Sequence, residues 1–143
     1  MRIRCFTTLL GGMLLSTATM AWGQRPTPAT GRGDSTVVLT PELIAFGDSV
    51  FHGKAGGGVC FSCHGQDGKG VSGLAPDLTS GKWLHGDGSY TFIVQTVEKG
   101  VPQPKQSLGP MPPMGGAKLS AAEVHAVAAY VFSLSHPSAR KSP

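Results

Sequence analysis

The stretch that decides the fold is Cys60-Phe61-Ser62-Cys63-His64, in which two cysteines stand three positions apart and a histidine follows the second directly. Positions i and i+3 of a helical turn lie on the same face, so both thiols can reach one edge of a flat ligand. The imidazole of the next residue then falls beneath the centre of that ligand. Cys-x-x-Cys-His is the motif at which two cysteines add to the two vinyl groups of a haem. The sequence therefore predicts one covalently bound haem c, held through Cys60 and Cys63, with His64 on the iron.

Other kinds of site also use a Cys-x-x-Cys pair. A structural zinc site needs four ligands, usually from two such pairs, and the chain after Cys5 contains one pair. A thioredoxin-like redox pair would lie in a βαβ pattern, which the sequence does not show. A plain disulfide between Cys60 and Cys63 would leave His64 without a role. Haem attachment is therefore the favoured interpretation.

Helical signals surround this motif. A segment over 41–52 has a threonine cap and a proline at its first position. A segment over 89–99 has apolar residues at helical spacing and ends before Gly100. A segment over 120–136 opens with a capping box of Ser120 and Glu123. No segment shows strand alternation, so we expect an all-α domain of three to four helices and long loops, whose small core a large apolar cofactor completes.

The two ends of the chain differ from this domain. Residues 1–23 combine a positive start, an apolar run and small closing residues, which is typical of a cleaved secretion signal. A retained membrane anchor is the alternative, but the apolar run is interrupted and a span needs about 20 mostly apolar residues. Segments 24–39 and 137–143 are predicted to be flexible. We therefore expect a haem domain over 40–136 that is exported to the periplasm.

The charge of the chain is concentrated at its ends. The formal net charge is +4, but the segment 40–136 contains six Lys, no Arg and seven Asp or Glu, which leaves −1. No basic patch with interleaved aromatic residues is present, so a nucleic-acid partner is not expected.

The second axial ligand of the iron is predicted from a proline-rich loop over 109–116. Prolines on both sides of Met111 stiffen the chain and lower the entropy lost when its sulfur binds, so Met111 is preferred to Met114. His85 is the competing ligand, because it lies in a loop that could face the haem and haem iron accepts either ligand type. Two further histidines, His52 and His125, are expected to be exposed residues of helices.

With these residues in place, the segment 40–136 resembles class I cytochrome c. The similarity includes the attachment motif, Met111-Pro112 before a last helix that contains Tyr130, and the pair Gly47 and Phe51. It implies the class I cytochrome c fold, in which the first helix crosses the last. Gly47 would then approach Val127, and Phe51 would lie beside Tyr130.

The same resemblance implies two further contacts of the cofactor. The carbonyl of Pro76 would accept a hydrogen bond from the ring of His64, which fixes the ring and raises its basicity. The indole N–H of Trp83 would lie near the haem propionates. Apolar side chains around the haem would favour ferrous iron. They are expected to be those of Leu74, Leu84, Ile93, Val97 and Leu108.

The function expected from these features is one-electron transfer between ferrous and ferric iron. No acid–base constellation accompanies the motif, so we expect an electron carrier with redox proteins as partners, no small-molecule substrate, and membrane contact only through partner complexes. A soluble periplasmic carrier is the first interpretation. A haem subunit bound to a periplasmic dehydrogenase or oxidase is the alternative, and a haem enzyme or gas sensor with an open iron position is less favoured.

Overall fold

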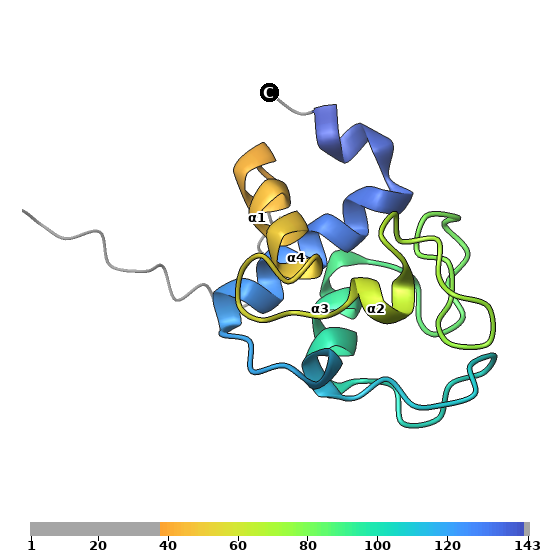
Figure 1. Ribbon diagram of the computed structural model, residues 1–143. Helices are drawn as coiled ribbons and strands as arrows, with labels where there is room; N and C mark the ends of the chain where they lie inside the picture. Colours follow the sequence, from red (N-terminus) through yellow and green to blue (C-terminus); the bar gives the residue numbers. More distant parts are fainter. Residues whose placement is uncertain (1–37, 142–143) are drawn as a thin grey trace, which may run out of the picture. The chain divides into compact units, whose positions relative to one another are not determined.

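The computed structural model describes residues 38–141, and Figure 1 shows them in colour. The predicted secretion signal over 1–23 and the segment 24–37 lie outside the described residues. The elements follow in the order α1 (Pro41–Phe51), α2 (Phe61–His64), α3 (Tyr90–Lys99), η1 (Pro113–Gly116), α4 (Ala121–Ser135) and η2 (Pro137–Lys141), of which η1 and η2 are 3-10 helices.

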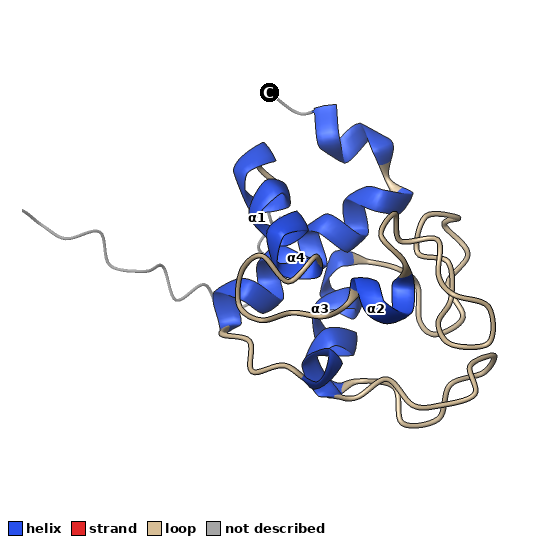
Figure 2. Cartoon of the chain, viewed as in Figure 1, coloured by secondary structure: helices blue, strands red, loops and turns tan. Residues whose placement is uncertain are grey.

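The described part of the chain contains helices and loops but no named strand (Figure 2). Its only β pairing consists of two isolated bridges, Val71 with Ala75 and Val101 with Met111. The predicted all-α class is confirmed. Long loops were also predicted, over about 66–88 and 101–118. The structure has loops over 65–89 and 100–112, followed by η1, and they carry much of the site described below.

The predicted helix starts are confirmed by their caps. The side chain of Thr40 accepts a hydrogen bond from the amide of Leu43 at 3.2 Å, and Ser89 does the same for Phe92 at 3.2 Å. Ser120 and Glu123 form the expected capping box at the start of α4. These bonds satisfy amide groups that no helical carbonyl can reach.

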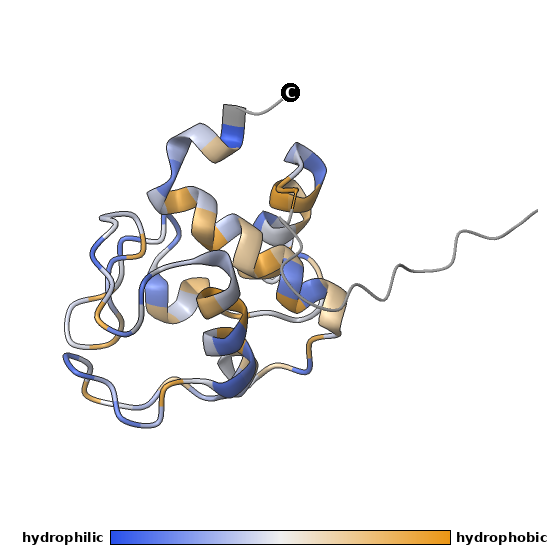
Figure 3. Ribbon diagram, turned by 180° about the vertical axis from the view of Figure 1, so that it is seen from behind, coloured by the Kyte–Doolittle hydropathy of each residue, from blue (hydrophilic) through white to orange (hydrophobic). Residues whose placement is uncertain are grey.

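The core forms where α1 and α3 pack on α4, and Figure 3 shows hydrophobic residues concentrated on these helices. At the α1–α4 crossing, a Cβ atom on Gly47 would lie 2.8 Å from the Cβ of Tyr130 and would overlap the carbonyl of Ala126. The Phe51 and Tyr130 rings pack 5.2 Å apart, as predicted. Gly47 was predicted to approach α4 near Val127, and the nearest atoms belong to the adjoining Ala126 and to Tyr130. Residues 126 and 130 share the face of α4 that meets α1, whereas Val127 lines the cavity described below.

The segment after α4 was predicted to be flexible from residue 137. In the structure Pro137–Lys141 instead form η2, which turns back on α4. The Arg140 side chain donates from Nε to Ser133 Oγ at 3.2 Å, and its guanidinium lies 5.9 Å from the centre of the Tyr130 ring. A buried hydroxyl and an aromatic face therefore hold a segment whose local sequence gives no helical signal.

Candidate haem-binding site

The two cysteines lie at the one-turn helix α2, as their spacing predicted. The amide of His64 donates to the carbonyl of Cys60 at 2.9 Å, and the amide of Cys63 donates to the same carbonyl at 3.2 Å. Cys60 is half-buried, Cys63 is exposed, and neither forms a disulfide. Burial raises the pKa of the Cys60 thiol, and the neighbouring Cys63 adds to this effect. The turn therefore presents two free thiols and an imidazole within five consecutive residues.

These three side chains line one cavity of about 260 Å³. Its walls come from α2, α3, α4 and both long loops, and they are mostly apolar. No Asp or Glu is among the described residues that line it. The apolar walls include Leu74, Leu78, Leu84, Ile93, Val97, Val127 and Val131.

His64 is oriented by the loop that follows it. Its Nδ1 lies 3.3 Å from the carbonyl oxygen of Pro76, the contact that the family resemblance implies. Burial lowers the pKa of His64, and the hydrogen bond to Pro76 only partly offsets this, so the neutral, metal-binding form of imidazole is favoured. The loop closes tightly because Gly70 has φ +78° and a Cβ there would lie 2.7 Å from the carbonyl carbon of Pro76.

Met111 lines the same cavity, whereas Met114 does not. The backbone of Met111 is fixed on both sides, since it donates to Val101 at 3.0 Å and accepts from Val101 at 2.8 Å. Met114 instead packs against the hydrophobic core and has φ +54°. Of the two methionines in the proline-rich loop, the structure brings only Met111 together with His64 and the cysteines.

Trp83 and His85 also line the cavity, as the sequence suggested. Trp83 packs directly over Gly88, where a Cβ would overlap the indole ring. The Nε2 atom of His85 is buried and has no hydrogen-bond partner among the described residues. Leu108 does not belong to the apolar surround. Its side chain is 94% exposed, because the loop turns outward where the amide of Leu108 donates to the carbonyl of Gly73 at 2.8 Å.

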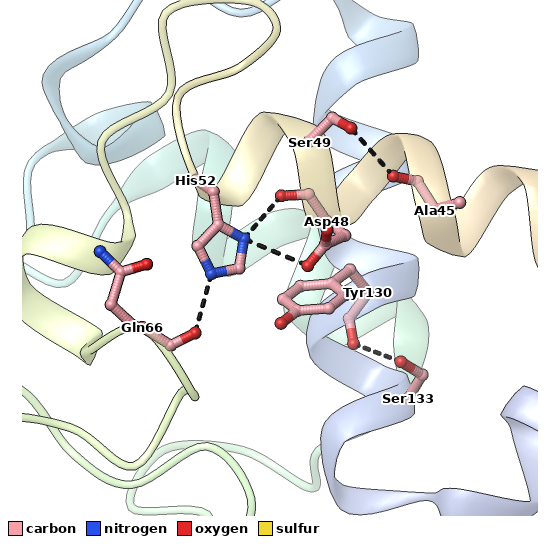
Figure 4. Close-up of polar contacts among 7 residues, drawn as sticks. All are labelled: Ala45, Asp48, Ser49, His52, Gln66, Tyr130 and Ser133. Atoms are coloured by element: carbon pink, nitrogen blue, oxygen red, sulfur yellow. Dashed lines mark hydrogen bonds and ion pairs between the residues drawn. The ribbon is translucent and has the colours of Figure 1, made fainter.

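His52 is a residue whose structural role the sequence did not reveal (Figure 4). It was expected to be exposed, but its side chain is 15% exposed. Nδ1 lies 2.9 Å from the carbonyl of Asp48 and 3.1 Å from its carboxylate, and Nε2 lies 2.8 Å from the carbonyl of Gln66. His52 thus ties the end of α1 to the loop just after the attachment motif. Its position beside the helix end carried no sequence signal for this contact.

His125 is exposed on α4, as expected, and the Tyr90 hydroxyl lies 2.8 Å from its Nδ1. It lines neither described cavity.

The functional groups that line the cavity are those that a haem c requires. It offers two free thiols for the vinyl groups, an imidazole and a thioether for the iron, and apolar walls for the porphyrin faces. The buried Nε2 of His85, which has no partner among the described residues, is free to bond a polar group of a ligand in this cavity.

The family model described as "Cytochrome C oxidase, cbb3-type, subunit III" matches residues 49–131, more than half of the chain. The chain belongs to this family. It is a c-type cytochrome of the cbb3 subunit III type, and its cofactor is a covalently bound haem c with iron. The predicted cytochrome family and cofactor are confirmed.

The curated relatives of this cbb3 subunit III family member are oxidase subunits. Cbb3-type cytochrome c oxidase subunit CcoP of Rubrivivax gelatinosus is 38% identical over 95 residues, which cover 66% of this chain and 27% of that protein. CcoP of Rhodobacter capsulatus is 44% identical over 82 residues, which cover 52% and 25%. Subunit FixP of Azorhizobium caulinodans is 38% identical over 76 residues, which cover 52% and 23%. The chain therefore spans about a quarter of the length of these relatives. No solved structure matches it.

Proposed function

We propose that this cytochrome transfers single electrons as a haem subunit of a respiratory oxidase, with Cys60 and Cys63 binding the haem and with His64 and Met111 as axial ligands. The observation that carries the site assignment is the single apolar cavity that all four side chains line. When bound, haem c supplies a one-electron ferrous–ferric couple. No small-molecule substrate is needed for this function.

The side chains around the iron set which oxidation state is favoured. The Pro76 carbonyl accepts from the His64 ring, which would leave the other ring nitrogen available to hold the iron. The thioether of Met111 favours ferrous iron relative to a second imidazole. The apolar side chains of Leu84, Ile93 and Val97 act in the same direction, because a low-dielectric surround disfavours the additional positive charge of ferric iron.

Electrons are proposed to leave at the edge of the site near Cys63. Cys63 is exposed, and two apolar residues that also line the cavity, Val59 and Leu74, are 45% and 44% exposed. Small, partly apolar contact areas suit the brief encounters of redox proteins.

The relatives support the oxidase-subunit assignment over the freely diffusing carrier that the sequence first suggested, because all of those compared are cbb3-type oxidase subunits. Export to the periplasm, through the predicted signal over 1–23, is part of the proposal. Among the described residues, no helix is both long enough and apolar enough to cross a bilayer.

The assembly is tested by isolating the tagged full chain from gently solubilised membranes of its own cells. Recovery of an oxidase core that consumes oxygen supports the oxidase subunit. Recovery of the cytochrome alone, in the soluble periplasmic fraction, supports the carrier and contradicts the proposed assembly.

The ligands are tested by spectroscopy of the haem-loaded protein. Met111→Ala is expected to abolish the sulfur-to-iron charge-transfer band and to allow rapid carbon monoxide binding, whereas the matched Met114→Ala variant keeps the band. Loss of the band in Met114→Ala alone would move the ligand to Met114. Rapid carbon monoxide binding by the wild type would instead indicate an open iron position.

A further inference from the structure

The imidazole of His85 has a buried nitrogen that the protein leaves unpaired. Nε2 has no partner among the described residues, although the surrounding loop is rich in polar groups. Buried polar atoms are usually hydrogen-bonded, to the protein, to ordered water or to a bound group. This observation points to a ligand group at His85.

The position of His85 indicates which part of the ligand this is. His85 lines the main cavity and also a second cavity, and Lys105 lines both as well. Neither Cys60, Cys63 nor His64 lines the second cavity. His85 and Lys105 therefore belong to the part of the lining that the two cavities share, whereas the thiols line the main cavity alone.

The charged side chains that line the two cavities are all cationic. Lys99 lines the second cavity together with Lys105, and no described Asp or Glu lines either cavity. Trp83 supplies an indole N–H with no hydrogen bond to any other described residue, and Ser107 supplies a hydroxyl; both line the main cavity. The described residues that line the two cavities therefore offer donors and cations but no carboxylate.

Haem carries its two vinyl groups on one edge and its two propionate carboxylates on the opposite edge. With the vinyl edge attached at Cys60 and Cys63, the propionates would lie on the side of the haem opposite these two residues. Met111 and His64 line only the main cavity, whereas His85 and Lys105 line both cavities.

We propose that His85 is a positioning residue that donates from Nε2 to a haem propionate and thereby raises the reduction potential. The inference rests on the proposed haem site. An ionised propionate favours ferric iron through its negative charge, and a hydrogen bond from His85 disperses part of that charge. Without the donor, the ferrous state becomes less favoured.

The test measures reduction potentials of the haem-loaded full chain with three variants. His85→Leu removes the donor, His85→Gln keeps an N–H at a similar reach, and His125→Leu is the matched control on the surface. His85→Leu is expected to shift the ferrous–ferric equilibrium toward ferric on the order of threefold to tenfold, where tenfold equals about 59 mV for one electron. His85→Gln should restore most of the shift, and His125→Leu should leave the potential unchanged.

The propionate bending vibration in resonance Raman spectra supplies a second readout, which should change in His85→Leu and not in His125→Leu. An unchanged potential and an unchanged vibration in His85→Leu would overturn the proposal. So would the loss of low-spin iron in that variant, since it would make His85 an iron ligand. The wild type is measured first and must show bound haem and the methionine charge-transfer band. If it does not, the proposed haem site fails; if it does, a negative result in His85→Leu concerns only the role of His85.

Discussion

Gly100 is the residue through which the backbone of α3 controls the position of Met111. It ends α3 with φ +68° and ψ −170°, a conformation that is essentially restricted to glycine. A Cβ atom there would lie 2.8 Å from the carbonyl carbon of Pro112 and would overlap the carbonyl oxygen of Met111. Because backbone atoms cannot rotate away, Gly100→Ala must displace the Met111 segment or the end of α3.

The size of the effect follows from two contributions. An alanine at this φ and ψ costs about 1–3 kcal/mol. The overlap with the Met111–Pro112 backbone adds about 1–3 kcal/mol. Gly57 provides a matched control, because its φ is +67° and a Cβ there would meet nothing within 4 Å. Gly57→Ala should therefore show a conformational cost without the overlap.

The assay combines denaturant unfolding of the haem-loaded protein with its methionine-to-iron charge-transfer band. We expect Gly100→Ala to lose more stability than Gly57→Ala by about 1–3 kcal/mol and to weaken or lose the band. Equal stability of the two variants, together with an intact band in Gly100→Ala, would refute the reasoning that close backbone approach fixes Met111.

Two further predictions concern the helices around the site. Gly47→Ala should gain about 1 kcal/mol from helix propensity but lose more from overlap with Ala126, giving a net loss of about 1–3 kcal/mol in unfolding free energy. As a control, Ala45→Gly at an exposed position of α1 should lose about 1 kcal/mol from propensity alone. A Gly47→Ala protein that is more stable than the wild type would contradict the proposed crossing. For His52, burial opposes the charged form, but hydrogen bonds to the carbonyls of Gln66 and Asp48 and the Asp48 carboxylate outweigh it and raise the pKa. The stability from its charged form is therefore fully present below the unfolded-state pKa of about 6.5 and is lost as the pH rises through the higher folded-state value. His52→Gln should thus destabilise the protein more at about pH 5 than at about pH 8, by less than about 1 kcal/mol, and an equal effect at both pH values would count against the raised pKa.

The helices could be predicted because their signals are local. Thr40, Ser89 and Ser120 each cap a helix through a bond to a residue three positions ahead, and such spacing can be read from the sequence alone. The cofactor was equally predictable, since Cys60, Cys63 and His64 meet within one helical turn. Gly47 was placed at the crossing near Val127, but its closest approach to Ala126 and Tyr130 depends on the rotation of α4, which no local signal reveals.

The loops could not be predicted in the same detail. Their glycine- and proline-rich sequences have no period, so the exposure of Leu108 and the pairing of Met111 with Val101 depend on long-range backbone contacts. His52 and His85 are examples of the same difficulty. The hydrogen bond from His52 to Gln66 depends on how the loop after the attachment motif folds, and so does the lack of a partner for His85 Nε2 among the described residues. Neither feature has a local sequence signal.

The central claim is that two thioether bonds at Cys60 and Cys63 hold one haem in this cavity. The most direct measurement is the intact mass of denatured protein matured in cells that export and assemble c-type cytochromes, combined with a pyridine haemochrome spectrum. The wild type should retain one haem per chain after denaturation, with the spectrum of two saturated vinyl groups, and Cys63→Ala should give the spectrum of a single linkage or no haem. A wild-type chain that loses all haem on denaturation would contradict the claim.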